Sequence, residues 1–419
     1  MDWARLRAVV IESDDWGLCA WVPDENAYRA LADSPAWRSP VGRIYGRSTL
    51  ESANDIARLA EILLGFRGGD GFPPVWQANT IMAAPDYDRL APPLFEVEEL
   101  PLVTLPDTPS RWSRPGLWEA VQEARNSGAW WPELHGLHHV PATAWLTALR
   151  RGVADARRAH EQQCLVCAGV EASAEYDRSE PEPQRTRSLG LAVDRFQALF
   201  GRRPESLCPP DYRWDETLER DAERLGVTTI QGKGEQAVSF PRLRRLVRQI
   251  GGIERSGKRF YMPPRIAFEP RGSASASARL GPERAHRNVR GAWGRGQPAV
   301  VSTHRVNFAH LDEGWSEKGR AALGDLLQRL AADSAIFLTD AEVRSLEERG
   351  WSARPIGDRG ALVRCYATSR PAVRFSPPAG VASVNVLEGR GPGASVRLED
   401  GDVVAELDRG EYLLEWGRA

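Results

Sequence analysis

The sequence predicts an α/β fold with a mostly parallel sheet, open or closed into a barrel, followed by a small antiparallel β domain. Strand-like and helix-like segments alternate along residues 6–340, and such repeats build parallel sheets covered by helices. After about residue 355 the chain holds only short alternating segments separated by Gly, Pro and Asp, which is typical of antiparallel strands. For 419 residues we expect one large domain over residues 1–350 and a small one over residues 355–419.

The first half of the chain supplies the first strands and helices of the series. Residues 6–13 form an apolar run that predicts a core strand, and residues 50–66 carry apolar side chains at helical spacing. The next segments are a strand over 73–83, a helix over 116–128, a strand running into a loop over 130–139, helices over 146–163 and 189–201, and a strand with a loop over 205–212.

The second half continues the alternation and then changes character. The expected elements are a helix over 215–226, a strand over 227–232, a strand and loop over 297–308, a helix over 319–333 and a strand over 335–340. Residues 271–285 are rich in small residues and predict a loop. We expect no helix after residue 355, and a role for that part in packing and capping; carbohydrate binding is the alternative.

Composition and charge exclude several classes of partner. The chain is 27% charged and 42% hydrophobic with a formal net charge of −2, which gives no sign of a nucleic acid or an anionic membrane as partner. No apolar stretch approaches the roughly 20 residues of a membrane span. The first residues lack the apolar core and cleavage site of a signal peptide, so we expect a cytoplasmic protein. The oligomeric state stays open.

The cysteines argue against a CxxC zinc site, and the tryptophans give weak support for a carbohydrate ligand. Of the five cysteines, Cys164 and Cys167 form a lone CxxC, and without a second pair they are better explained as reduced thiols than as a zinc site. The chain holds fifteen tryptophans, a residue that packs on sugar rings but also fills cores. Trp16, directly after two aspartates, is our candidate for a substrate contact.

Asp14 and Asp15 stand side by side at the end of the first predicted strand. Neighbouring side chains on a strand point to opposite faces, but this rule relaxes at the carboxyl end, where both carboxylates can face one pocket. Adjacent carboxylates repel unless a positive charge lies between them, so the pair favours a metal site. The alternative is that both only cap the following turn.

Three of the seven histidines fall within five residues, directly after a predicted strand. His135 and His139 lie four residues apart, a spacing that puts both rings on one side of a helix or compact turn. With the Asp15 carboxylate they make three ligands, the number that catalytic zinc uses. The sequence therefore predicts a divalent metal, zinc by the number and type of its ligands, with His138 pointing away. A structural role for the histidines is the alternative.

Other polar residues at predicted strand ends complete a set for acid–base chemistry. Asp14, not used as a ligand, can accept a proton from a metal-bound water, and His304, at the end of a late strand, can protonate a leaving amine. The backbone amides of Asp211 and Tyr212 are candidate donors to an oxyanion.

These motifs resemble the polysaccharide deacetylase (NodB-homology) family, carbohydrate esterase family four. The likeness spans roughly residues 5–345 and rests on Asp14-Asp15, the His-x-x-x-His of His135 and His139, the proline-rich "LCPPDYRW", and the late "STHRV". It implies a distorted (β/α) barrel of about seven strands, a divalent metal, usually zinc, and hydrolysis of N-acetyl groups on sugars. By this resemblance Asp14 is the base, His304 the acid, and Asp15, His135 and His139 the ligands.

The chain departs from the family pattern at two positions. Gly136 stands where the family has Ser or Thr, and Cys208 stands where it has an arginine that pairs with the base. We expect Arg213, Arg305 or a backbone amide to take the place of that arginine beside Asp14. With these departures the chain resembles a divergent bacterial branch of the family. The predicted function is metal-dependent removal of N-acetyl groups from a sugar or saccharide intermediate. The alternatives are a catalytically weakened saccharide-binding relative and a hydrolase of another C–N amide bond.

Overall fold

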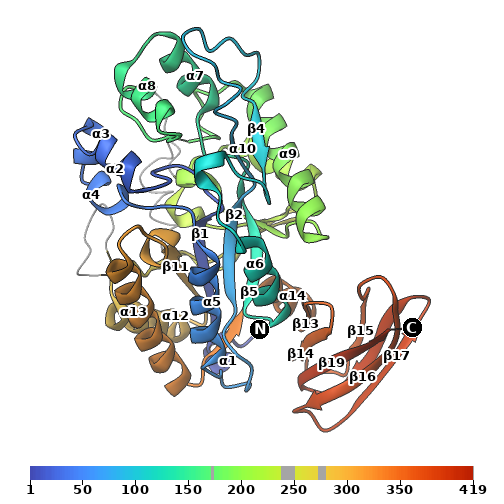
Figure 1. The fold of residues 1–419 in the computed structure, drawn as a ribbon. Coiled ribbons are helices and arrows are strands. Elements are labelled where there is room, and N and C mark those ends of the chain that lie inside the picture. Colours follow the sequence, from blue (N-terminus) through green and yellow to red (C-terminus); the bar gives the residue numbers. More distant parts are fainter. Residues whose placement is uncertain (171–173, 237–250, 272–279, 419) are drawn as a thin grey trace.

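A ten-stranded sheet organises the computed structural model, which describes residues 1–170, 174–236, 251–271 and 280–418 (Figure 1). Its strands are β1 (Ala8–Trp16), β2 (Trp76–Ile81), β5 (Trp130–Gly136), β6 (Ser206–Leu207), β7 (Thr229–Ile230), β8 (Glu254–Ser256), β9 (Arg259–Tyr261), β10 (Arg265–Ala267), β11 (Ala299–His304) and β12 (Ile336–Leu338). Nine of them follow the order β10-β11-β1-β2-β5-β6-β7-β9-β8, and β12 pairs with β1. All pairs are parallel except β8 with β9.

The mixed α/β architecture agrees with the sequence, but the strand number does not. The sheet has ten strands, where about seven were expected, because β8, β9 and β10 form in a part of the chain with little apolar periodicity. The path of nine strands ends at β10 and at β8, so in the described residues the sheet is curled but open, which is consistent with the distorted barrel that was expected.

Helices cover the sheet and form the connections between its parallel strands. They are α1 (Trp3–Leu6), α5 (Ala53–Leu64), α6 (Leu117–Asn126), α9 (Glu182–Phe200), α10 (Glu216–Arg224), α12 (Pro282–Gly294), α13 (Glu313–Ala332) and α14 (Asp340–Arg349), with short 3-10 turns η1 (Ser110–Trp112), η2 (Pro210–Tyr212), η3 (Lys233–Glu235) and η5 (Arg305–Asn307). Capping boxes start α5, at Ser52, and α14, at Thr339. Ile56, Leu59 and Leu63 repeat at helical spacing and bury one face of α5 in the main core.

Two expectations for the helices are wrong. Residues 146–163 do not form one helix: α7 (Ala142–Arg150) and α8 (Ala154–Glu161) are separated at Gly152, whose φ of +74° lies outside the helical region. Residues 282–285, expected in a loop, begin α12, where Pro282 occupies the first turn. The rest of that expected loop, residues 272–279, lies outside the described residues.

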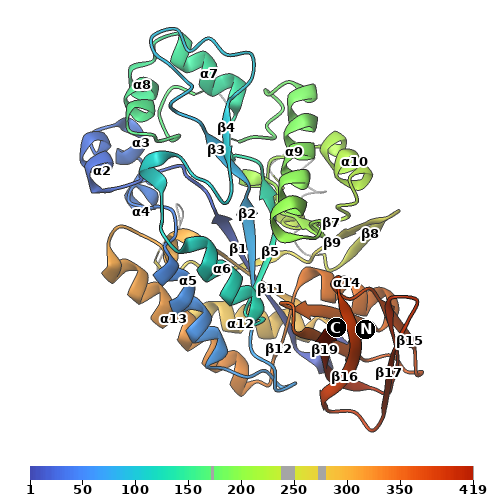
Figure 2. The same ribbon diagram turned by 45° about the vertical axis from the view of Figure 1, so that its right-hand side comes forward.

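Two insertions lie together beyond the carboxyl ends of β1 and β5 (Figures 1 and 2). The first carries α2 (Glu25–Leu31), α3 (Pro35–Arg38) and α4 (Gly42–Tyr45), and the second carries α7 and α8. Ser34 Oγ donates to Asp155 Oδ2 at 2.8 Å, and Leu165 N donates to Ala20 O at 2.8 Å. These bonds fix the two insertions to each other above the sheet.

Residues 351–418 form two small antiparallel sheets, and no helix occurs from 355 to 418, as expected. One sheet has the order β13-β14-β19-β16 and the other β15-β18-β17; a hairpin of β3 (Ala83–Pro85) and β4 (Leu102–Thr104) lies apart from them. Their bounds are Trp351–Ile356 (β13), Gly360–Cys365 (β14), Ala372–Phe375 (β15), Val381–Gly389 (β16), Ala394–Glu399 (β17), Asp402–Leu407 (β18) and Gly410–Arg418 (β19). The division near residue 350 into two folding units stays a prediction.

A buried ion network joins these small sheets to the rest of the chain. Arg364 on β14 has no exposed side-chain surface, donates to Asp70 Oδ2 at 2.7 Å and also pairs with Glu342 of α14. Arg354 on β13 pairs with the same Glu342 at 3.2 Å. Two carboxylates and two guanidinium groups therefore neutralise one another at the junction, and loss of one partner leaves a buried charge uncompensated.

We expect Arg364→Met to lower the free energy of unfolding by about 3–5 kcal/mol, because Asp70 and Glu342 lose their shared cation. Urea denaturation followed by circular dichroism measures the change. The matched control is Arg418→Met, whose exposed pair with Asp358 at 3.1 Å should be worth less than about 1 kcal/mol. Equal midpoints for the two variants would contradict a stabilising role for the network.

None of the helices in the described residues is long and apolar enough to cross a membrane.

Candidate active site

A β-bulge turns both aspartates to the same cavity. In the pairing of β1 with β2, Ser13 lies opposite Ala78 and Trp16 opposite Thr80, so Asp14 and Asp15 face the single residue Asn79. Asp15 takes up the extra position with a φ of +74°. A bulge breaks the alternation of side chains and re-aims one of them. Because of the bulge, Asp14 and Asp15 line the same cavity although they are neighbours on one strand.

A second bulge places the first histidine. Between β2 and β5, Thr80 pairs with Leu134 and Ile81 with Gly136, which leaves His135 as the additional residue. His139 in the following turn also has positive φ, at 64°. A positive φ in a residue other than Gly carries strain that the surrounding structure must hold, and such strain gathers at functional sites.

Asp15, His135 and His139 come together as the sequence predicts. Asp15 Oδ1 lies 3.4 Å from His135 Nε2 and 3.7 Å from His139 Nε2, and one ligand atom of each residue lies within 4.8 Å of the others. His135 Nδ1 donates to Cys208 O at 2.7 Å, because a carbonyl can only accept. The Nε2 lone pair of His135 is therefore directed toward Asp15 and free to bind a cation.

This donor set fits a divalent metal better than the other cluster around His135. Asp14, His135 and Cys208 also approach one another, but Asp14 is held by other partners and burial raises the pKa of the Cys208 thiol well above its usual value. Two imidazoles and a carboxylate that open into a cavity match the three protein ligands of catalytic zinc.

Glu175 organises the turn that carries the histidines, and sequence reasoning missed it. Its carboxylate accepts from the backbone amides of Leu137, His138 and His139 at 2.9–3.2 Å, and Ser188 also donates to it. Burial alone would raise the pKa of Glu175, but His138 and these amides hold it below its usual value. His138 Nδ1 lies 3.8 Å from Glu175 Oε2, and His138 does not line the cavity that holds Asp15.

Arg265 on β10 is the cation beside Asp14. Its guanidinium donates to Asp14 Oδ2 at 2.6 Å and to Oδ1 at 3.1 Å, while Asn79 donates to Oδ1 at 2.6 Å. Burial would raise the pKa of Asp14, but Arg265 and His135 hold it well below its usual range. Asp14 is therefore ionised near neutral pH.

The sequence pointed to the wrong arginines for this role. Arg213 pairs with Asp177 at 3.2 Å, and Arg305 is buried against Glu51 at 2.9 Å, because the turn after His304 directs it away from the cavity. Arg265 carried no visible signal, since only the pairing of β10 with β11 brings it near β1.

His304 faces Asp14 from the neighbouring strand, where the two residues are register partners. Its Nε2 lies 3.9 Å from Asp14 Oδ2, and its Nδ1 bonds Glu269 Oε1 at 2.6 Å. Burial would lower the pKa of His304, but the carboxylates of Glu269, Asp15 and Asp14 raise it to about 10. A protonated His304 presents its second N–H to the cavity. Glu269 was not expected from the sequence.

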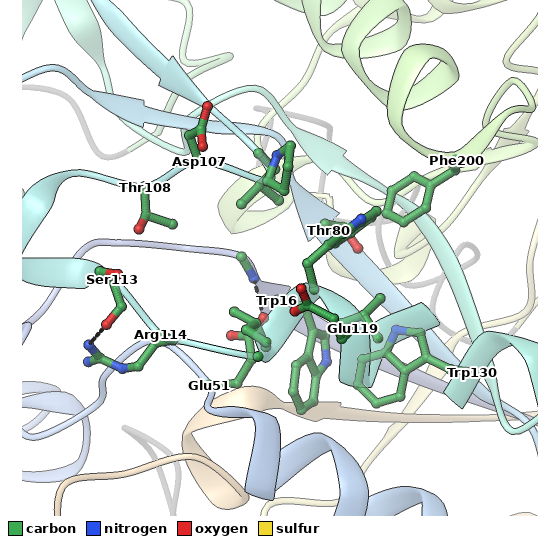
Figure 3. A pocket seen from close by; sticks show the side chains of 17 residues that line it. Trp16, Glu51, Thr80, Asp107, Thr108, Ser113, Arg114, Glu119, Trp130 and Phe200 are labelled. Atoms are coloured by element: carbon green, nitrogen blue, oxygen red, sulfur yellow. Dashed lines mark hydrogen bonds between the residues drawn. The ribbon is translucent and has the colours of Figure 1, made fainter. Parts of the chain in front are cut away.

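Of the three residues that the sequence proposed as substrate contacts, two line the cavity and one does not. Asp211 and Tyr212 line the cavity, but Tyr212 N donates to Pro209 O at 3.0 Å, so of the two amides only that of Asp211 stays a candidate oxyanion donor. Trp16 does not line this cavity. Its ring lies in a separate pocket against Trp130, at 4.6 Å between centroids (Figure 3). Trp16 Nε1 donates to Ser13 Oγ.

The cavity above the candidate ligands has a volume of about 570 Å³. Its floor carries Asp14, Asp15, His135, His139 and His304, and its sides come from both insertions. The cysteines are free, including the CxxC pair, which agrees with reduced thiols. Burial raises the pKa of the Cys167 thiol to about 12, so this cavity residue is not a thiolate near neutral pH.

Comparisons with known proteins give only distant likeness. No family model matches the chain, and no curated protein matches it either. Similar solved structures include a 4-alpha-glucanotransferase from Thermococcus litoralis (9% identity, 81% of this chain, TM-score 0.42) and a GH57-type branching enzyme from Pyrococcus horikoshii (10%, 81%, 0.44). A third is a family 4 carbohydrate esterase from Streptomyces lividans (11%, 79%, 0.31).

The chain spans 40% of the glucanotransferase, 70% of the branching enzyme and 91% of the esterase. Since all three TM-scores are below 0.5, these likenesses assign no activity to the chain.

Proposed function

We propose that the protein is a metal-dependent amide hydrolase that removes N-acetyl groups from an N-acetylated sugar or saccharide intermediate. The observation that carries this proposal is one cavity floor holding a carboxylate and two imidazoles at ligand spacing, beside Asp14, which is paired with Arg265, and His304, which is paired with Glu269. The family resemblance of the motifs supports the same reaction. The proposed metal is zinc or a similar divalent cation.

Asp15, His135 and His139 would hold the cation through one oxygen and two ring nitrogens. A divalent cation bound there would polarise the amide carbonyl and bring the pKa of a water to roughly 7, acidic enough for a weakly basic carboxylate to take its proton.

Two side chains of the protein then carry out the two proton transfers of the reaction, one from the attacking water and one to the leaving nitrogen. Asp14 accepts the proton of the attacking water, and Arg265 with Asn79 fixes the orientation of its carboxylate. A C–O bond forms, the C–N bond breaks, and His304 donates its Nε2 proton to the departing nitrogen. Glu269 holds the other ring nitrogen and so keeps the imidazole charged and aimed. The products are a carboxylate and a free amine.

The alternative of a saccharide-binding relative without catalysis would use the same cavity. It requires no turnover and no protonated His304, so release of carboxylate and amine from a bound substrate separates the two possibilities. The second alternative is that the same chemistry hydrolyses another C–N amide bond in place of an N-acetyl group.

Metal titration of the whole protein tests the ligand assignment. Isothermal calorimetry with zinc should give one site per chain, and His139→Ala should weaken binding strongly, because it removes one of three ligands. The matched control is His138→Ala in the same turn, whose ring faces Glu175. If His138→Ala removes the site and His139→Ala retains it, the ligand set is wrong.

The alkaline limb of the pH–rate profile should report His304, whose proton is required for turnover. Activity should persist as pH rises until His304 deprotonates, and Glu269→Gln should move this limb to lower pH by about 1 unit or more, because the nearest carboxylate is lost. Profiles of kcat for both proteins, loaded with the same metal, provide the comparison. An unmoved limb would assign the titration to another group.

A further inference from the structure

The cavity above the candidate ligands has one apolar side. We call this side the apolar wall and define it by Leu18, Ala20, Val140, Trp145, Leu165 and Val166. Leu18 and Ala20 follow β1, Val140 and Trp145 follow the histidine turn, and Leu165 and Val166 come after α8. None of these residues figured in the sequence-based site.

The wall is a fixed part of the fold. Leu18, Ala20, Val140, Trp145 and Leu165 belong to one packed cluster, and Val166 packs against it. A backbone hydrogen bond also joins two segments of the wall, since Leu165 N donates to Ala20 O at 2.8 Å. A packed wall of this kind keeps its shape instead of collapsing into the cavity.

The wall offers little to a sugar ring. A buried hydroxyl needs a hydrogen-bond partner, and the one N–H among the side chains of the wall, the indole N–H of Trp145, is itself buried. The carboxylates and imidazoles that the proposed reaction uses lie on the floor, and Asp211, the other ionisable carboxylate of the lining, is not part of the wall. An alkyl group would gain by leaving water against these side chains.

The cavity is also larger than an acetyl group requires. Its 570 Å³ falls in the range that accepts ligands of drug size, while the methyl of an acetyl group would fill only a small part of the space beside the scissile bond. Unfilled apolar surface would stay hydrated or void, which favours a substrate that covers it.

We propose that the amide substrate carries an apolar group larger than a methyl, and that this group lies along the apolar wall. The inference rests on the proposed amide hydrolysis and names its substrate class. The apolar group can come from the acyl part of the amide, as in an N-hexanoyl amino sugar, or from an alkyl group on the sugar's anomeric oxygen. Both present the same chemistry to Leu18, Trp145 and Leu165.

Two substrate series distinguish these sources. The first is glucosamine with N-acyl chains from acetyl to octanoyl, and the second is N-acetylglucosamine with anomeric alkyl chains from methyl to octyl. In at least one series kcat/KM should rise by roughly fourfold for each methylene that the wall buries. A flat or falling response in both series overturns the inference, even if N-acetylglucosamine itself is hydrolysed.

Two wall variants test the location. Val166→Asp, or the uncharged Val166→Asn if the first variant does not fold, should reduce the ratio of long-chain to acetyl kcat/KM at least tenfold. The control is Leu387→Asp on β16, a residue 61% exposed and outside the cavity, which should leave the ratio unchanged. An unchanged ratio in the folded wall variants would contradict the assignment.

Binding separates failure of the inference from failure of the proposed function. Calorimetry of N-hexanoylglucosamine and N-acetylglucosamine with the Asp14→Asn protein measures affinity without turnover. Tighter binding of the longer chain, or of an octyl over a methyl glycoside, supports the wall, and equal affinity within both pairs overturns it. Absence of hydrolysis from every substrate by the unmodified, metal-loaded protein instead overturns the proposed function.

Discussion

Replacing Asp14 by Asn is expected to lower kcat at least about a hundredfold while the protein still binds its metal. The substitution removes the proton acceptor but none of the proposed ligands Asp15, His135 and His139. Arg265 loses one of its two carboxylate partners and keeps Glu12, so circular dichroism and zinc calorimetry must show that fold and metal site persist.

Asp211→Asn is the matched control for this variant. Asp211 lines the same cavity and has a φ of +51°, a conformation that Asn tolerates, and its backbone amide is unchanged by the substitution. We expect Asp211→Asn to keep most of its activity. If Asp14→Asn is active and Asp211→Asn is not, Asp211 is the base and the function of the Arg265 pair must be structural.

His304→Gln is expected to lower kcat by roughly 10²- to 10⁴-fold with little change in KM, because its proton is needed only when the C–N bond breaks. A substrate with an activated leaving group, such as p-nitrophenyl acetate, departs without that proton and should be hydrolysed at nearly the unmodified rate. Steady-state kinetics with an amide and with this ester give the two values.

His310→Gln is the control for loss of a nearby histidine. His310 stacks on Trp315 at 4.8 Å between ring centroids and does not line the cavity, so its removal should leave kcat unchanged. An equal loss of amide and ester hydrolysis in His304→Gln would contradict a role as general acid and indicate a role in holding the site together.

The floor of the cavity could be predicted because it lies at strand ends. Apolar runs mark β1, β5 and β11, and the polar residues that follow them meet at one edge of a parallel sheet. Local sequence therefore located Asp14, His135 and His304. The mechanism that turns Asp14 and Asp15 to the same side, a bulge, depends on the register with β2 and leaves no trace in the sequence.

The groups that tune the floor could not be predicted, because they depend on long-range pairing. Arg265 and Glu269 reach Asp14 and His304 only since β10 pairs with β11, and Glu175 reaches the histidine turn from a segment before α9. Trp16 was misplaced for a related reason: the bulge sends its ring into the pocket beside Trp130 (Figure 3).

The most direct test is to measure both products, carboxylate and free amine, from N-acylated glucosamine incubated with metal-loaded protein. We expect the two in equal amounts, loss of both after chelation, and recovery when zinc is added back. The same measurement with Asp14→Asn should yield far less product from a protein that still binds zinc. If N-acyl sugars bind to the metal-loaded protein and neither product forms at any pH, the protein is a saccharide-binding relative and the hydrolase account is wrong.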